Sequence, residues 1–337
     1  MIAGRRRQSV SNTLLFLFMS SMSFVSPNSW ELISLICKLG LYLGLCAQAG
    51  CLVNLAFYND GSRRTTQGLL RYGLLGSVLG FKAVLLNYLV QVGMINANGV
   101  AGMFDWAMIQ LLLDTPQGES TLWRLLGFTL ALLTAVWALQ FLAGLRKPPT
   151  SQQMRLILLP LIFALLIQAG SFQMSGHVAV LGTSGQLAIA LHVMAFAYWI
   201  GSLLPLYWLS LHQSGKQLQW HMARFGDHAR LILLVLLLAG GLMLWQLLHS
   251  PSELLQTPYG LSLLLKLLLV AGLMAIAAHN RFALVPQLVP ALESDTTQSD
   301  AARLRLRSSI KMEMLLALAI LAVTAYLSTL VGPMDHA

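Results

Sequence analysis

The sequence predicts an all-α polytopic membrane protein, a bundle of eight transmembrane helices. Of its 337 residues, 57% are hydrophobic and only 10% are charged, and the mean hydropathy is +0.70. Soluble domains carry about 25% charged residues, so most of this chain cannot face water. Several apolar runs have the length of about 20 residues that a helix needs to cross a hydrocarbon core of about 30 Å.

Eight apolar segments have the length of membrane spans. A further segment, residues 103–114, is too short and too acidic at its ends, so we expect an amphipathic piece at the interface. No loop is long enough for a soluble domain, so residues 28–337 are expected to form one membrane domain. The spans are predicted at residues 30–57, 70–93, 122–144, 156–174, 186–210, 230–248, 261–281 and 312–331.

The first residues have the pattern of a targeting segment. Arg5, Arg6 and Arg7 precede a short apolar run at residues 14–25. A charged region followed by about a dozen apolar residues is typical of a secretory signal peptide. We predict a signal-like segment at residues 1–27, with an uncleaved extra helix as the alternative.

The net charge of +9 comes from basic residues that are scattered over short loops, not gathered in one patch. We therefore interpret them as signals of membrane topology, and we predict no nucleic-acid partner. The loops at residues 93–121, 174–185, 249–260 and 332–337 hold no Lys or Arg, whereas the alternate loops and the helix ends beside them hold 14 of the 21. The positive-inside rule puts the basic loops in the cytoplasm and both ends of the bundle outside.

Two histidines flank an uncharged loop between the fourth and fifth spans. At a rise of about 1.5 Å per residue, His192 lies on the order of 10 Å below the outer surface, within reach of a loop that carries His177. Met174 would share a helix face with His177, whereas Met194 would point away from His192. Imidazole and thioether suit Cu(I), and imidazole alone suits Cu(II). We predict an outward-facing copper site here; haem bound between the two histidines is the alternative.

Three lysines lie inside apolar runs, where a charged group costs about 2.5–3.5 kcal/mol. Lys38 and Lys266 are close enough to the outer surface to snorkel. Lys82 lies near the midplane, so we expect it to face the bundle interior or a watery path, where it would bind an anion or stabilise a helix contact.

Four histidines belong to the cytoplasmic side. His228 and His279 lie at helix ends and are predicted to form an exit site for an ion. His212 and His221 are expected to be solvated loop residues.

The three cysteines, Cys37, Cys46 and Cys51, show no CxxC spacing, and we expect buried thiols, with metal ligation as the alternative. The sequence has no P-loop, HExxH, G-x-S-x-G or P-type phosphorylation motif. We therefore predict neither an enzyme nor a pump with its own motor.

Five motifs in order resemble the copper-resistance D family (CopD/PcoD) of inner-membrane proteins. They are S-G-H-V-A at 175–179, L-H-V-M-A-F-A-Y-W-I-G-S-L-L-P-L at 191–206, A-R-F at 223–225, T-P-Y-G-L-S-L-L-L-K-L-L-L-V at 257–270 and N-R-F-A-L-V-P-Q-L at 280–288. The CopD-like core would cover about residues 150–332.

The resemblance implies a multi-pass protein of the bacterial inner membrane, surrounded by lipid and linked to periplasmic copper handling, resistance and homeostasis. It also implies a small periplasmic copper-binding partner. The open alternatives are copper transport, copper transfer, and a membrane scaffold for a periplasmic copper chaperone.

The resemblance also assigns individual residues of this chain to positions of the family motifs. His177 and His192 match family positions, and Lys266, Asn280 and Arg281 match others without an assigned role. Relatives often have a histidine early in the first span, where this chain has Cys37, so Cys37 is a predicted replacement ligand.

Overall fold

The computed structural model describes residues 26–331, apart from 60, 146, 175–181, 214, 249, 251 and 289–295. Most of the predicted signal-like segment lies outside the described residues. Within them, eight helices are long and apolar enough to cross a membrane, as predicted. They are α2 (Ser29–Phe57), α3 (Arg63–Asn96), α5 (Pro116–Gly144), α6 (Ser151–Ser171), α7 (Thr183–His212), α8 (Gly215–Leu247), α10 (Pro258–His279), which continues into the π-helical turn η3 (Asn280–Leu284), and α12 (Thr296–Thr329).

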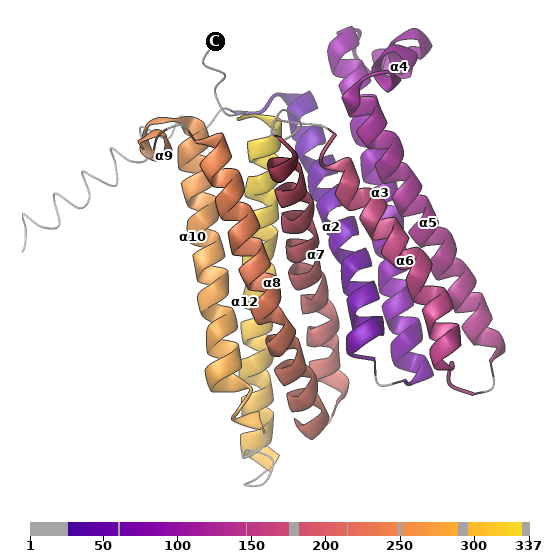
Figure 1. Ribbon diagram of the computed structural model, residues 1–337, viewed down its shortest axis with the longest axis vertical. Coiled ribbons are helices and arrows are strands. Elements are labelled where there is room, and N and C mark those ends of the chain that lie inside the picture. Colours follow the sequence, from indigo (N-terminus) through magenta and orange to yellow (C-terminus); the bar gives the residue numbers. More distant parts are fainter. Residues whose placement is uncertain are drawn as a thin grey trace, which may run out of the picture.

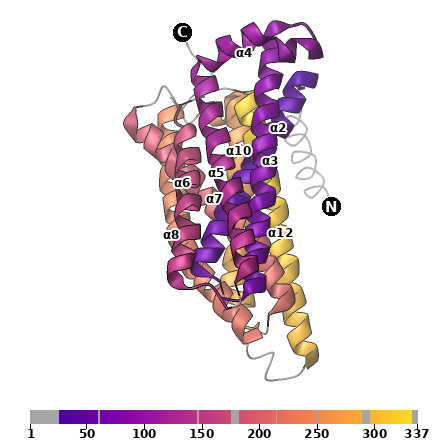
Figure 2. The ribbon, with the colours of Figure 1, turned by 90° about the vertical axis from the view of Figure 1, so that its right-hand side faces the viewer.

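The eight helices run alternately up and down in one elongated bundle (Figure 1; Figure 2). Helices α2, α3, α5 and α6 pack together in one half, and α7, α8, α10 and α12 form the other. Helix α2 contacts both α7 and α12 and so joins the two halves. Hydrophobic residues of both halves form a shared core around Leu45, Phe128 and Ala197.

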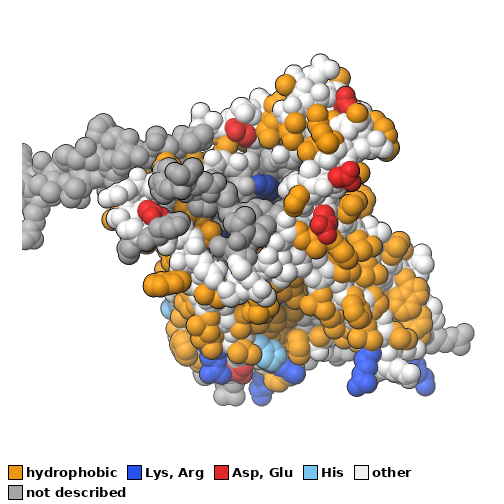
Figure 3. All heavy atoms as spheres, turned by 45° about the horizontal axis from the view of Figure 1, so that its top comes forward, with side chains coloured by type: hydrophobic (Ala, Val, Ile, Leu, Met, Phe, Trp, Pro, Cys, Tyr) orange, Lys and Arg blue, Asp and Glu red, His pale blue; other side chains and the backbone are white. Residues whose placement is uncertain are grey.

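The two ends of the bundle differ in charge. The 3₁₀ turn η1 (Val100–Phe104) and the short helices α4 (Trp106–Leu113) and α9 (Glu253–Gln256) lie at the end that we call the α4 end. The opposite end, called the basic end, carries the loops rich in Lys and Arg, and Figure 3 shows this separation of acidic and basic side chains.

The helices are longer than the apolar windows that predict them. Helix α12 begins at Thr296 and not near residue 312. Its early turns bury Leu306 and Ile310 against α7 and α8, so packing continues the helix beyond the apolar window. The segment at 103–114 does not span, as predicted, and it exposes Phe104 and Trp106.

Glycines allow α2 to approach its neighbours very closely. A Cβ on Gly50 would lie 2.0 Å from the Gly201 carbonyl oxygen, and one on Gly201 would lie 1.9 Å from the Cys46 carbonyl oxygen. Further along α2, a Cβ on Gly44 would lie 2.7 Å from the Gly76 carbonyl oxygen of α3. Small residues at such crossings let helix backbones meet within a membrane.

A buried chain of hydrogen bonds crosses the same half of the bundle. Gln168 Nε2 of α6 donates to Gln48 Oε1 of α2 at 2.6 Å, and Gln48 Nε2 donates to Ser77 Oγ of α3 at 2.9 Å. Interhelical hydrogen bonds of this kind stabilise helix association in a membrane.

The Gly50–Gly201 contact predicts a sharp response to one added methyl group. Gly201→Ala would force the α2 and α7 backbones apart and lower stability by at least about 1–3 kcal/mol, the usual cost of overpacking. Gly170→Ala is the control, because a Cβ there meets nothing within 4 Å. The measurement is the midpoint of thermal unfolding in detergent, and equal midpoints for the two variants would contradict the predicted role of this contact.

Candidate functional site

His192 lies in the half of α7 nearest the α4 end, and its ring faces α8. The imidazole Nδ1 lies 3.3 Å from the Leu236 carbonyl oxygen. A carbonyl only accepts, so Nδ1 carries the hydrogen and Nε2 holds a lone pair in the neutral ring. This tautomer, fixed by a backbone carbonyl, is the usual arrangement of a metal-binding histidine.

Two further residues define the surroundings of His192. A Cβ on Gly240 of α8 would lie 3.2 Å from the imidazole Cε1 and Nδ1 atoms, so any side chain there would press on the ring. Lys266 of α10 lies close enough to act electrostatically on the imidazole. The structure thus brings together two residues that the sequence singled out separately.

The rest of the predicted copper site is less complete. His177 lies outside the described residues. Met174 follows α6 at the α4 end and is half-buried, and Met194 packs against the shared core. Among the described His, Cys, Asp and Glu residues, no group of three or more is placed to hold a metal ion. The copper ligand set therefore stays a prediction.

A polar cavity of about 340 Å³ opens at the α4 end between α2, α3, α5 and α12. Cys37 lies in its wall and is buried. Figure 3 looks onto this end and shows a basic side chain inside a hollow. The polar and charged residues that line the cavity are Glu31, Ser34, Lys38, Asn87, Gln91, Gln117, Thr121, Arg124, Ser328 and Thr329.

Two cations from different helices, Lys38 of α2 and Arg124 of α5, line this cavity together with the carboxylate of Glu31. Lys38 Nζ donates to the Ser328 carbonyl oxygen at 2.5 Å. Arg124 Nε donates to Ser171 Oγ at 3.1 Å, and its guanidinium lies 4.7 Å from the centre of the Phe172 ring. The two positive charges repel each other, and a metal cation beside Cys37 would be repelled as well.

Cys37 and His192 do not line the same cavity. Tyr42, which lines the α4-end cavity, contacts Phe196 with ring centres 6.3 Å apart, and Phe196 contacts His192 at the same separation. Two aromatic rings therefore connect the cavity wall with His192. The cysteines are free and buried, which confirms the prediction of buried thiols.

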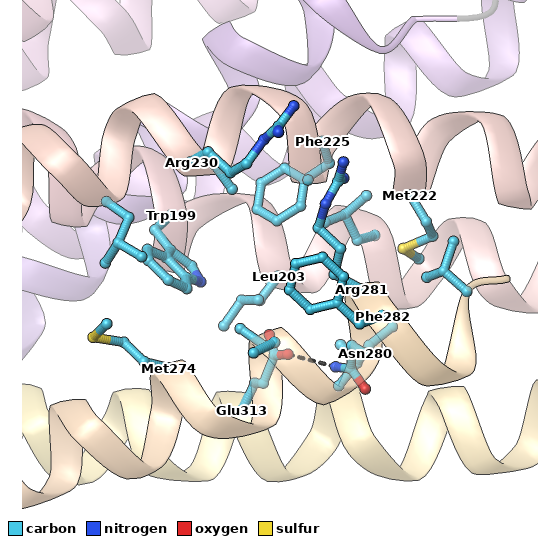
Figure 4. Close-up of a pocket in the computed structure, with 18 of the residues that line it drawn as sticks. Trp199, Leu203, Met222, Phe225, Arg230, Met274, Asn280, Arg281, Phe282 and Glu313 are labelled. Carbon is cyan, nitrogen blue, oxygen red and sulfur yellow. Dashed lines mark hydrogen bonds between the residues drawn. The ribbon is translucent and has the colours of Figure 1, made fainter.

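A second cavity, of about 210 Å³, lies toward the basic end between α7, α8, α10, η3 and α12. Figure 4 shows Glu313 of α12 at its wall, with Asn280 Nδ2 donating to Glu313 Oε1 at 2.5 Å. Arg281 donates instead to Asp227 Oδ1 at 2.7 Å and to the Ala223 carbonyl oxygen at 3.0 Å. Asn280 and Arg281, which had no role from the sequence, thus hold two different acidic groups.

The predicted exit site is not assembled as a pair. His228 Nδ1 lies 2.7 Å from the Tyr58 hydroxyl, which lies 2.5 Å from the Tyr198 hydroxyl. His279 is exposed at the end of α10, and within the described part of the chain no hydrogen bond or ring contact joins it to His228. The structure therefore gives His228 a tyrosine partner between α2, α7 and α8.

One of the two predicted loop histidines is misplaced. His212 is exposed, as expected. His221, by contrast, is buried, and its Nε2 lies 3.0 Å from the Tyr58 carbonyl oxygen. The prediction for His221 is wrong because α8 already begins at Gly215, so the ring turns toward the end of α2.

Lys82 does not face the bundle interior. Its neighbours Ala83 and Val84 are buried, and the helical phase of α3 leaves Lys82 exposed. No hydrogen bond or ion pair joins Lys82 to another residue in the described ranges, so the structure shows no helix contact through its ammonium group, and anion binding stays a prediction. Its long stem suits an ammonium group that snorkels away from the apolar surface.

Sequence reasoning missed Glu313 and Arg124. Both are charged residues just inside predicted spans, at 312–331 and 122–144, and that position was the available signal. The longer observed helices place both side chains inside the bundle.

Comparisons with known proteins agree with the resemblance. Residues 220–327 match the family model described as Copper resistance protein D (CopD). Inner membrane protein YebZ of Escherichia coli (strain K12) is 30% identical over 211 residues, which cover 59% of this chain and 65% of that protein. No solved structure matches. The predicted family resemblance is confirmed, and the inner-membrane relative and the eight apolar helices support a multi-pass inner-membrane protein.

The charge of the α4-end cavity predicts which reagents reach Cys37. Sulfonatoethyl methanethiosulfonate, an anion, should modify Cys37 several-fold faster than the trimethylammonioethyl reagent, a cation, once each rate is divided by its rate with a small free thiol. Lys38→Met should reduce this ratio, because it removes one positive charge. Added salt should also reduce the ratio, but by less than it would at a solvent-exposed thiol, because salt screens charges in a partly buried cavity only weakly. Labelling is followed by mass spectrometry with Cys37→Ser as the blank, and a preference for the cation would refute the prediction.

Proposed function

Residues 220–327 of this chain match the copper resistance protein D family, and from that premise we propose that the chain transports or transfers copper across or at the inner membrane. The proposed role is a contribution to copper resistance and homeostasis, beside a small periplasmic copper-binding protein. The family match is the observation that carries this proposal.

The environment of His192 supports a metal-binding role for its ring. The Leu236 carbonyl orients the imidazole, and Nε2 keeps its lone pair for a ligand. The ring lies on the face of α7 turned to α8, and α8 lies almost wholly within the segment that matches the family. His177 and Met174 are the proposed further ligands, and both belong to the connection between α6 and α7.

The distribution of basic residues supports an outward orientation of this site. His192 is closer to the α4 end, where the loops carry no Lys or Arg. Under the positive-inside rule the α4 end would face the periplasm. Copper would then meet His192 from the periplasmic side.

Copper binding by the purified protein is the first test. We expect about one copper ion per chain, and the double variant His177→Ala plus His192→Ala should lose it, because imidazole is the main ligand type at the site. Elemental analysis after gel filtration gives the stoichiometry. An absorption spectrum of the same sample tests haem, since a Soret band would favour haem ligation by the histidines. Unchanged copper content in the double variant would overturn the proposed site.

A pair of neighbouring glycines offers a matched test of the His192 environment. Gly240→Ala should weaken copper binding several-fold, because the new methyl group would press on the imidazole at 3.2 Å. Gly241→Ala should leave binding unchanged, since a Cβ there meets nothing within 4 Å. Competition with a copper chelator measures both affinities, and equal losses in the two variants would contradict the proposed orientation of the ring.

Transport is tested with right-side-out and inverted membrane vesicles. Uptake in one orientation, lost in the His177→Ala plus His192→Ala variant, would show both transport and its direction. If deleting the gene changes the copper sensitivity of the cells, but neither type of vesicle moves copper, the protein would instead act as a scaffold for a periplasmic chaperone.

A further inference from the structure

The cavity of Figure 4 holds a carboxyl group that the proposed copper chemistry does not use. Glu313 belongs to the span Asp300–Thr329 and is only 4% exposed. All the residues that line the cavity fall within 220–327 except Trp199, Leu203 and Leu206 of α7. The segment that matches the family therefore builds nearly the whole chamber around this carboxyl.

Glu313 has no basic partner within ion-pair distance in the described part of the chain. The basic residues that line the same cavity are Arg230 of α8 and Arg281 of η3. Both bind Asp227, at 2.8 Å and 2.7 Å. The lining residues from α7 and α10 contain no titratable group, so the neutral amide of Asn280 is the hydrogen-bond donor that the structure shows for Glu313.

The surroundings do not compensate a negative charge. Apart from Arg230 and Arg281, the other walls are apolar or aromatic, and two further polar atoms, Trp199 Nε1 and Asn280 Oδ1, have no hydrogen-bond partner among the residues that the structure describes. Their residues are only 5% and 8% exposed. A buried carboxylate whose hydrogen-bond donor is a neutral amide is costly, so burial here favours the carboxylic acid with its proton bound.

A π-helical turn connects this carboxyl with the water at the basic end. The Val285 N–H donates to the Asn280 carbonyl oxygen at 2.9 Å. This hydrogen bond joins residues five apart, as in a π-helix, and not four apart as in an α-helix. This turn directs Asn280 toward Glu313 and the next residue, Arg281, toward Asp227. The Asp227 side chain is 52% exposed, so the polar edge of the cavity reaches solvent. Single π turns of this kind are frequent at functional sites.

The cavity does not have the ligands of a copper site. Met222 and Met274 line it, but Figure 4 shows them at opposite ends, with Glu313 between. Two thioethers so separated do not converge on one ion. A proton needs no such ligand set.

We propose that Glu313 is a proton-binding site that exchanges its proton with water at the basic end through this cavity. In the release step the O–H bond of the acid breaks, its electron pair stays on the carboxylate, and the proton passes to water at the mouth beside Asp227. The Asn280 amide N–H then donates to the carboxylate. This proposal does not depend on the protein binding copper.

Dicyclohexylcarbodiimide tests the proposal, because it reacts with protonated carboxyls in apolar surroundings: the acid proton goes to a carbodiimide nitrogen and the carboxyl oxygen bonds to the central carbon as a C=N double bond becomes single. The metal-free, full-length protein in detergent is treated over a pH series and digested for mass spectrometry. We expect the adduct on Glu313, with faster labelling as the pH falls. Exposed Glu119 should remain unlabelled under the same conditions and serves as the control carboxyl.

The isosteric variant Glu313→Gln provides the second readout, because its amide oxygen still accepts from Asn280. The infrared band of a protonated carboxylic acid should be present in the wild type and absent from this variant, while Glu119→Gln keeps it. No adduct on Glu313 at any pH, or an acid band that survives in Glu313→Gln, would overturn the proposal. Copper binding enters neither measurement, so this proposal and the copper proposal fail separately.

Discussion

The contact of Gly50 on α2 with Gly201 on α7 is the constraint on which the rest of the bundle depends. It is the point where the two halves of the molecule meet backbone to backbone, and a single Cβ on either glycine would separate them. Gly201 lies between Trp199 and Leu203 in the sequence, and both of those side chains line the Glu313 cavity. The same contact therefore fixes the rotation of α7, which directs one face toward α2 and the other toward the cavity.

The rotation of α7 also decides where its histidine lies. His192 points to α8, at Leu236 and Gly240, and Phe196 one turn later points to Tyr42 of α2. This geometry separates His192 from Cys37, whose cavity carries the charges of Lys38 and Arg124. Lys38 and Arg124 would repel a copper cation beside Cys37, and Lys266 would act in the same sense at His192. The oriented lone pair of His192, and not the electrostatic field, therefore makes it the proposed primary ligand.

The sequence predicted most of the fold and only part of the site. Hydropathy identified all eight spans because the apolar length of a span is a direct requirement of the bilayer. It misjudged helix ends, as at residue 296, because tertiary packing extends α12 beyond its apolar window. Hydropathy could not predict which face of α3 packs against the bundle, and that choice leaves Lys82 exposed. It also could not predict the early start of α8, which buries His221. Glu313 was missed for the same reason, since its environment comes from α7, α8 and η3 together.

The imidazole of His192 and the cavity around the Glu313 carboxyl both border the interface between α7 and α8. His192 contacts Leu236 in the carboxyl-terminal half of α8. The Glu313 cavity lies between α7, α8 and η3, closer to the basic end. Helix α8 is exposed over most of its surface, so its position relies chiefly on α7. A small shift of α8 against α7 would move the Leu236 carbonyl at His192 and the Arg230 and Phe225 walls of the cavity together. Because His192 and one wall of the Glu313 cavity lie along this helix pair, a movement there would reach the proposed metal ligand and the surroundings of the proposed proton site at once.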